Sequence, residues 1–148
     1  MGSLGNVSSV SVAYEAGAVI GRELTATGFN VNFAPVLDLN TNTDNPIIGQ
    51  RSISNDPVRV AVLTKAMVQG THDNSVIACG KHFPGHGDTR EDSHETLPVC
   101  DLDLDRLREK ELYPYRELIQ NPPHLDMVMT AHVLYPKVDP ERPATLSR

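Results

Sequence analysis

The sequence predicts an α/β fold built on a parallel sheet. Short apolar stretches at residues 31–38, 76–80 and 127–130 have the length and composition of buried strands. Between them lie longer stretches whose apolar residues recur every three or four positions, as in helices that face a core. Strands that alternate with such helices indicate βα units. Three strands are too few for a finished parallel sheet of this kind, so we expect part of a larger barrel.

The first predicted helix spans residues 9–27. Small and apolar side chains recur there at helical spacing, and Gly28 stands where helices commonly stop. The strand at residues 31–38 follows, and Pro35 predicts that its regular pairing ends there, because proline has no N–H to donate. Residues 40–57 are rich in Asn, Asp, Thr and Pro, which predicts a loop.

The same order of elements then repeats along the chain. A second helix is predicted to begin at Pro57, with Asp56 as its N-cap. The strand at residues 76–80 comes next, and a charged helix is predicted over about residues 103–119. The third strand covers residues 127–130. Since the strands are apolar throughout, we expect helices to cover both faces of the sheet.

Chemically reactive side chains stand where each of the three strands ends. Asp38 ends the first strand, Lys81 and His82 follow the second, and His132 follows the third. In parallel α/β folds the carboxyl ends of the strands line the active site. A charge beside a buried strand needs a partner or a polar ligand. We therefore expect Lys81 and His82 to point into a site or to pair with an aspartate such as Asp38, and the two roles are compatible.

A histidine loop, residues 81–94, holds an unusual density of titratable side chains. It contains three histidines, three acidic residues and a lysine, and it is too rich in glycine and proline to be a helix. Asp92 and His94 are two positions apart, so in an extended segment both side chains project to one face. The carboxylate would fix the tautomer of the imidazole and favour its protonated form, which suits general acid–base catalysis. The alternative is that this pair only ties the loop to itself.

Two further interpretations concern ligands. Arg51 lies in the loop at residues 40–57, where its fork of donors could hold hydroxyls or an amide oxygen, or where it could be a solvated surface arginine. A metal site would draw on the histidine loop, but Pro84 and Gly85 exclude the helical spacing that would place two of its histidines on one metal. The residues that could bind a metal there are His82, His86, Asp88, Asp92 and His94. Because of this geometry, we expect no metal site.

Composition excludes several classes of function. The net charge is −6, and no run of lysine or arginine could neutralise phosphates, so a nucleic acid partner is not expected. No apolar stretch approaches the roughly 20 residues that cross a bilayer. Phosphate-binding and dinucleotide fingerprints are absent, and no cofactor is expected. Cys79 and Cys100 are expected to be buried, reduced thiols.

The segment KHFPGHGDTREDSHETLP at residues 81–98 closely resembles the signature of the N-acetylhexosaminidase branch of glycoside hydrolase family 3. Three other segments match the same family in order and register, and the resemblance spans essentially the whole chain. They are NFAPVLDLN at 32–40, NPIIGQRSIS at 45–54 and MTAHVLYPKVDPERPATLS at 129–147.

The resemblance implies a fragment, residues 1–148, of an N-terminal (β/α)8 barrel. Its expected activity is removal of terminal β-linked N-acetylglucosamine, with retention of configuration, from peptidoglycan or chitin-derived sugars. In that family the DSH element supplies the acid/base catalyst, which maps onto His94 assisted by Asp92. Arg51, Lys81 and His82 match positions that grip the sugar hydroxyls and the N-acetyl group.

The resemblance also implies that a retaining mechanism would be incomplete here. Such hydrolysis needs a carboxylate nucleophile about 5 Å from the acid, and the family carries it in a later SD motif that this sequence lacks. The family's early strands are missing as well. We therefore expect the isolated chain to be inactive. Two other interpretations are a sugar-binding remnant without catalysis and a metal-dependent hydrolase.

Overall fold

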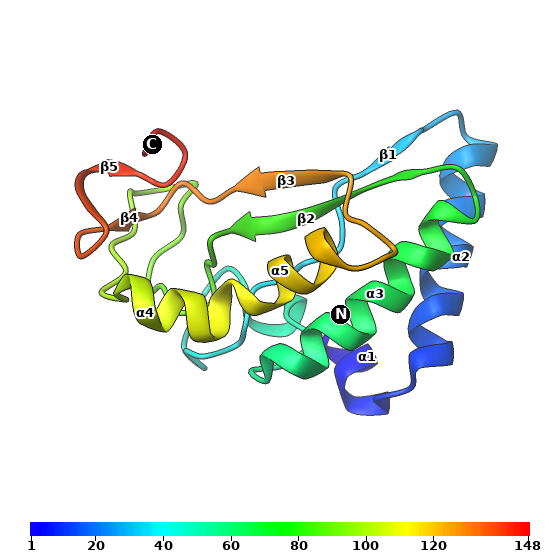
Figure 1. The fold of residues 1–148 in the computed structure, drawn as a ribbon, viewed down its shortest axis with the longest axis horizontal. Helices are drawn as coiled ribbons and strands as arrows, with labels where there is room; N and C mark the ends of the chain where they lie inside the picture. Colours follow the sequence, from blue (N-terminus) through cyan, green and yellow to red (C-terminus); the bar gives the residue numbers. More distant parts are fainter.

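A three-stranded parallel sheet, in the order β1-β2-β3, forms the centre of the fold (Figure 1). The computed structural model describes residues 1–148. The central strand β2 (Ile77–Phe83) pairs with β1 (Val31–Asn32) on one side and with β3 (Met127–Thr130) on the other. Since all three strands run in the same direction, their carboxyl ends meet at one edge. The predicted α/β fold with a parallel sheet is confirmed.

The first strand is shorter than predicted, and the second is longer. Regular pairing of β1 ends before Pro35, as its missing N–H predicts. The chain nevertheless continues beside β2, since the N–H of Lys81 donates to the Pro35 carbonyl at 3.2 Å and the N–H of Leu37 donates to the Lys81 carbonyl at 2.7 Å. This irregular stretch carries Asp38 to the end of the sheet. Lys81 and His82 belong to β2 itself rather than following it.

The first two predicted helices are confirmed. In α2 (Val10–Ala26) the Ser9 hydroxyl accepts from a backbone N–H of the first turn, and in α3 (Pro57–His72) the Asp56 carboxylate does the same. The two helices pack closely because Gly17 of α2 has no side chain. A Cβ there would lie 2.2 Å from the Met67 carbonyl oxygen. A short helix, α1 (Gly2–Val7), precedes them and was not predicted. No helix combines the length and the apolar character that crossing a membrane requires.

The single helix predicted over residues 103–119 is wrong in one respect, because the structure divides it into three. These are α4 (Leu104–Arg106), a π-helical turn η2 (Leu107–Glu111) and α5 (Tyr113–Gln120). Pro114 explains the break, since it cannot donate the helical hydrogen bond to the turn before it. The N–H of Leu112 instead reaches back five residues to the Leu107 carbonyl, at 2.8 Å.

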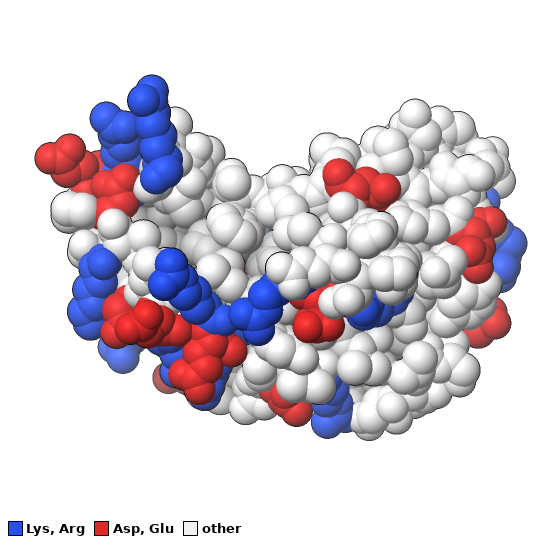
Figure 2. All heavy atoms as spheres, viewed as in Figure 1, with Lys and Arg blue, Asp and Glu red and all other residues white.

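Helices cover one face of the sheet, not both as predicted. In Figure 1, α3 and α5 lie on the same side of β2 and β3, and the main core lies between these helices and the sheet. On β3, an edge strand, Met127 and Val128 project to opposite faces and are 41% and 40% exposed. The space-filling view shows a hollow above these strands with few charged side chains, while charges gather over α4 and η2 (Figure 2). In a (β/α)8 barrel this second face is covered by other strands, not by helices.

A hairpin follows β3 and was not predicted. Strands β4 (Leu134–Tyr135) and β5 (Asp139–Pro143) pair antiparallel, next to the end of the sheet that carries the reactive side chains. The Tyr135 hydroxyl donates to the Gly85 carbonyl, which fastens the histidine loop to this hairpin. Cys100 packs beside Tyr135 in a second small core. Both cysteines, Cys79 and Cys100, are buried and unbridged, as predicted.

Candidate active site

A pocket of about 250 Å³ lies at the carboxyl ends of β2 and β3. Three predicted site residues, Arg51, His82 and His94, line it together with His132. Arg51 comes from the 3-10 turn η1 (Gly49–Arg51) in the loop after β1, and the others come from β2, the histidine loop and the segment after β3. The other lining residues are Ile47, His86, Ser93, Met129, Thr130 and Ala131. The fold thus gathers side chains that lie far apart in the sequence.

Asp38 organises the floor of this site. Its side chain is fully buried, and one carboxylate oxygen lies 2.7 Å from His82 Nδ1. The backbone N–H of His86 donates to the other oxygen at 2.7 Å. The aspartate pair anticipated for the second strand end is therefore made by His82 and not by Lys81. Because Nδ1 is engaged, Nε2 is the ring nitrogen of His82 left for a ligand.

Lys81 is half-buried beside this pair and has no carboxylate within ion-pair distance. Burial lowers its pKa, and the nearby positive charge of Arg51 lowers it further. Arg51 donates one hydrogen bond, from Nη1 to the Ile47 carbonyl at 2.9 Å, which leaves other guanidinium donors unused. Asp38 is the nearby carboxylate, but it bonds to His82 and forms no ion pair with either cation. The free donors of Lys81 and Arg51 therefore suit the binding of a polar ligand rich in acceptor oxygens.

Buried hydrogen bonds join the histidine loop to the loop after β1. Asn45 donates from Nδ2 to the carbonyl oxygens of His86, at 2.8 Å, and Thr89, at 3.0 Å. Its Oδ1 accepts from the N–H groups of Ile47 and Ile48. Since the whole amide of Asn45 is used, the two loops are held in one register. The sequence missed this residue, because an asparagine before a proline predicts only a turn.

Gly87 lets the histidine loop pass directly against the loop after β1. A Cβ at this position would lie 1.6 Å from the Leu39 carbonyl oxygen, a distance that no side chain tolerates. On the other side of this contact, the N–H of Asn42 donates to the Gly87 carbonyl at 3.3 Å. The glycine therefore fixes where the loop leaves the sheet on its way to Asp92 and His94.

Asp92 and His94 are in contact, as predicted, although the predicted backbone shape is wrong. Asp92 Oδ1 lies 2.6 Å from His94 Nδ1 and also accepts from the His94 N–H at 2.9 Å. The two residues thus form a turn closed by the aspartate side chain, not an extended segment. These two hydrogen bonds lower the pKa of Asp92 and keep it ionised. The His94 side chain is 77% exposed and faces the pocket edge.

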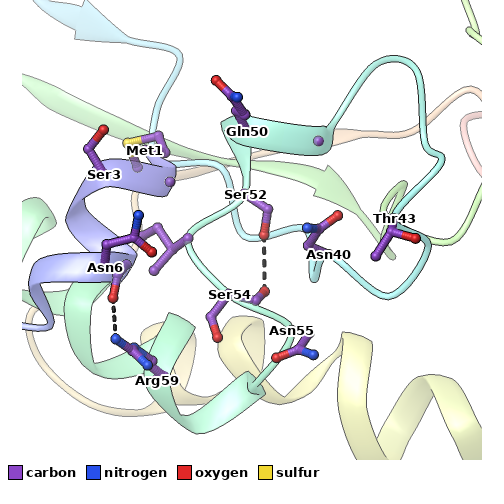
Figure 3. A pocket seen from close by; sticks show the side chains of 14 residues that line it. Met1, Ser3, Asn6, Asn40, Thr43, Gln50, Ser52, Ser54, Asn55 and Arg59 are labelled. Atoms are coloured by element: carbon purple, nitrogen blue, oxygen red, sulfur yellow. Dashed lines mark hydrogen bonds between the residues drawn. The ribbon is translucent and has the colours of Figure 1, made fainter.

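Other possible sites receive less support from the structure. No group of three or more His, Cys, Asp or Glu side chains is close enough to hold a metal ion. A larger cavity, about 660 Å³, lies between the first helix and the loop after β1 (Figure 3). Hydroxyl and amide side chains such as Ser3, Asn40 and Ser54 line it, along with Arg59. It has no imidazole or carboxylate, and therefore no group suited to acid–base chemistry.

The buried imidazole of His86 predicts a pH-dependent stability. Burial lowers its pKa because the charged form is disfavoured, whereas in the unfolded chain a histidine titrates near 6.5. As pH falls below about 6.5, the unfolded state therefore binds a proton that the folded state binds only at lower pH, and the free energy of unfolding decreases. Urea unfolding at about pH 7 and pH 5 should show this loss. The loss should be smaller in His86→Asn, and an identical loss would contradict the assignment.

All of residues 1–148 match the family described as Glycosyl hydrolase family 3 N terminal domain. Beta-hexosaminidase A of Pseudoalteromonas piscicida is 42% identical over 154 residues, which cover 97% of this chain and 25% of that protein. A beta-hexosaminidase of Idiomarina loihiensis is 38% identical, over 95% of this chain and 42% of that protein. The chain thus spans between a quarter and about two fifths of the length of these relatives.

Solved structures show the same relationship. A glycoside hydrolase family 3 beta-N-acetylglucosaminidase from Paenibacillus sp. str. FPU-7 superimposes with a TM-score of 0.93 at 49% identity, over 99% of this chain and 28% of that one. NagZ from Neisseria gonorrhoeae, solved with N-trifluoroacetyl-D-glucosamine, gives a TM-score of 0.84 at 40% identity, over 90% and 38% of the two chains. This chain belongs to glycosyl hydrolase family 3 and forms part of its N-terminal (β/α)8-type barrel domain.

Proposed function

We propose that this chain carries the proton-donating and sugar-gripping part of a retaining β-N-acetylhexosaminidase site. Its substrates would be terminal β-linked N-acetylglucosaminides, such as those derived from peptidoglycan or chitin. The observation that supports this most is the 2.6 Å contact of Asp92 with His94, at the edge of a pocket that also holds Arg51 and His82. The names of the relatives, beta-hexosaminidase and beta-N-acetylglucosaminidase, support the substrate class.

His94 is the proposed acid/base catalyst. Asp92 accepts from its Nδ1, so the second ring nitrogen, Nε2, is the one that can exchange a proton with substrate. In the first step Nε2–H would protonate the departing glycosidic oxygen, and in the second step the same nitrogen would take a proton from water. The high exposure of His94 gives a substrate access to this nitrogen.

Arg51, Lys81 and His82 are the proposed sugar-binding residues. The guanidinium of Arg51 and the ammonium of Lys81 can donate to hydroxyl or acetamido oxygens. The buried carboxylate of Asp38 holds the His82 ring in one orientation, so its Nε2 can meet a hydroxyl without first being ordered. These contacts would place the anomeric carbon within reach of His94 and of a nucleophile.

No carboxylate lines the pocket, and a retaining mechanism needs one about 5 Å from the acid. We therefore expect no turnover by the isolated 148-residue chain. The test uses a chromogenic N-acetylglucosaminide with two proteins: the chain alone, and a chimera in which it replaces the matching segment of the Paenibacillus enzyme. The chain alone should release no chromophore, while the chimera should release it at a rate comparable to that of the parent.

Two results would contradict the proposal. The first is rapid release by the chain alone, with a sugar bound covalently to one of its own aspartates. The second is a folded but inactive chimera. Saturable binding of N-acetylglucosamine to the chain, combined with an inactive chimera, would instead favour a sugar-binding remnant without catalysis.

A further inference from the structure

We propose that His132 is an additional substrate-binding residue, whose Nε2 accepts a hydrogen bond from a hydroxyl group of the N-acetylhexosamine. This inference rests on the proposed function, because it names a further contact in the same pocket. It adds a residue from the segment after β3 to a set that otherwise comes from β2, the histidine loop and the loop after β1.

The position of His132 places it on the substrate side of the sheet. It follows Ala131, whose N–H donates to the Phe83 carbonyl at 2.6 Å, so the segment remains fastened to the end of β2. Ala131 is buried, whereas His132 is exposed and lines the pocket with Arg51 and His94. No carboxylate pairs with its ring. The side chain thus contributes to the pocket and not to the core.

Hydrogen bonding to Thr145 determines which ring nitrogen of His132 carries the hydrogen. The Thr145 hydroxyl donates its only hydrogen to the Ala131 carbonyl, at 3.0 Å. Its oxygen lies 3.3 Å from His132 Nδ1 and can act toward that nitrogen only as an acceptor. Nδ1 is therefore the protonated nitrogen of the neutral ring, and Nε2 is left as an acceptor without a protein partner.

An acceptor at this place complements the charged donors of the pocket. Each hydroxyl of a pyranose both donates and accepts, so it binds best between a donor and an acceptor. Arg51 and the neighbouring Lys81 can only donate while charged, and no carboxylate lines the pocket. The Nε2 atom of His132 supplies an uncharged acceptor, and burying it against a sugar costs less than burying an ionised carboxylate.

The experiment follows the ring nitrogens of the 148-residue chain by two-bond ¹H–¹⁵N correlation NMR at about pH 8, where an ordinary imidazole is neutral. Without ligand, His132 should show an unprotonated Nε2 and a protonated Nδ1. Titration with N-acetylglucosamine should shift the His132 Nε2 signal along one saturable curve, together with a signal of His82 or His94. His132→Ala should weaken binding about tenfold, the effect of one lost hydrogen bond.

Matched variants separate binding from structure. Thr145→Val removes the acceptor for Nδ1 and should weaken binding severalfold, while Thr145→Ser keeps the hydroxyl and should restore it. His124→Ala removes an exposed histidine that does not line the pocket and should leave binding unchanged. All four variants should keep the amide spectrum of the folded chain, because these side chains lie outside the buried core.

The possible outcomes distinguish this inference from the proposed function. Saturable shifts at His82 or His94 with no change at His132 would overturn the role of His132 alone. The opposite tautomer in the free protein would do the same. The absence of any saturable shift would count against the proposed sugar site, and the role of His132 would fall with it.

Discussion

Replacing His94 by alanine in the active chimera is expected to lower kcat by about 10²- to 10⁴-fold for substrates with a poor leaving group, the usual contribution of a positioned general acid. Such substrates need a proton on the departing oxygen. For a substrate whose leaving group is stable as an anion, glycosylation should be much less affected, because no proton is needed at that step. The measurement is kcat and kcat/KM for both classes of substrate, compared with the unsubstituted chimera.

Asp92→Asn provides a matched control for this prediction. The asparagine can still accept from His94 Nδ1, but it removes the negative charge that favours the imidazolium. We therefore expect a smaller loss of rate than in His94→Ala, for substrates with a poor leaving group. Equal losses of kcat/KM, which reports the glycosylation step, for good and poor leaving groups in His94→Ala would reject the role of His94 as an acid.

The local elements of the fold could be predicted because their signals lie within a few residues of one another. Asp56 and Pro57 mark the start of α3, and the three apolar strands stand out by length and composition. Pro114 indicates the break before α5. The leucines around it recur at helical spacing, and for that reason a single helix was predicted. The hairpin after β3 had no such signal, since β5 is largely polar and contains two prolines.

Only part of the site could be predicted, because some of its residues are recognised by their place in the sequence and others only by contacts that form on folding. Arg51, His82 and His94 were found because strand ends in parallel sheets meet at one edge and because the histidine loop is so dense in titratable groups. Asn45 could not be found, since its function depends on backbone groups about 40 residues away that only folding brings near. The partner of Asp38 was a choice between two neighbours, which strand geometry alone decides.

The second large effect is expected at Asp38. Asp38→Ala should lower the free energy of unfolding by several kcal/mol, since each buried donor left without an acceptor costs about 1–3 kcal/mol. The His82 ring and the backbone N–H of His86 would both lose a carboxylate oxygen, and the Asp38 side chain that supplies it is fully buried. Urea unfolding of the variant, compared with the unsubstituted chain, measures the difference.

Asp126 offers a control with the same chemistry but a different environment. It also lies 2.7 Å from a histidine, His72, and also accepts from a backbone N–H, that of Ala78 at 2.8 Å. Its side chain is 38% exposed, so water can replace the lost oxygen, and Asp126→Ala should cost only about 1 kcal/mol. If burial makes the contact of Asp38 with His82 important for stability, the two variants must differ severalfold in their loss of free energy of unfolding. Similar losses in both would mean that Asp38 is merely one contact among many, and that the orientation of His82 has another cause.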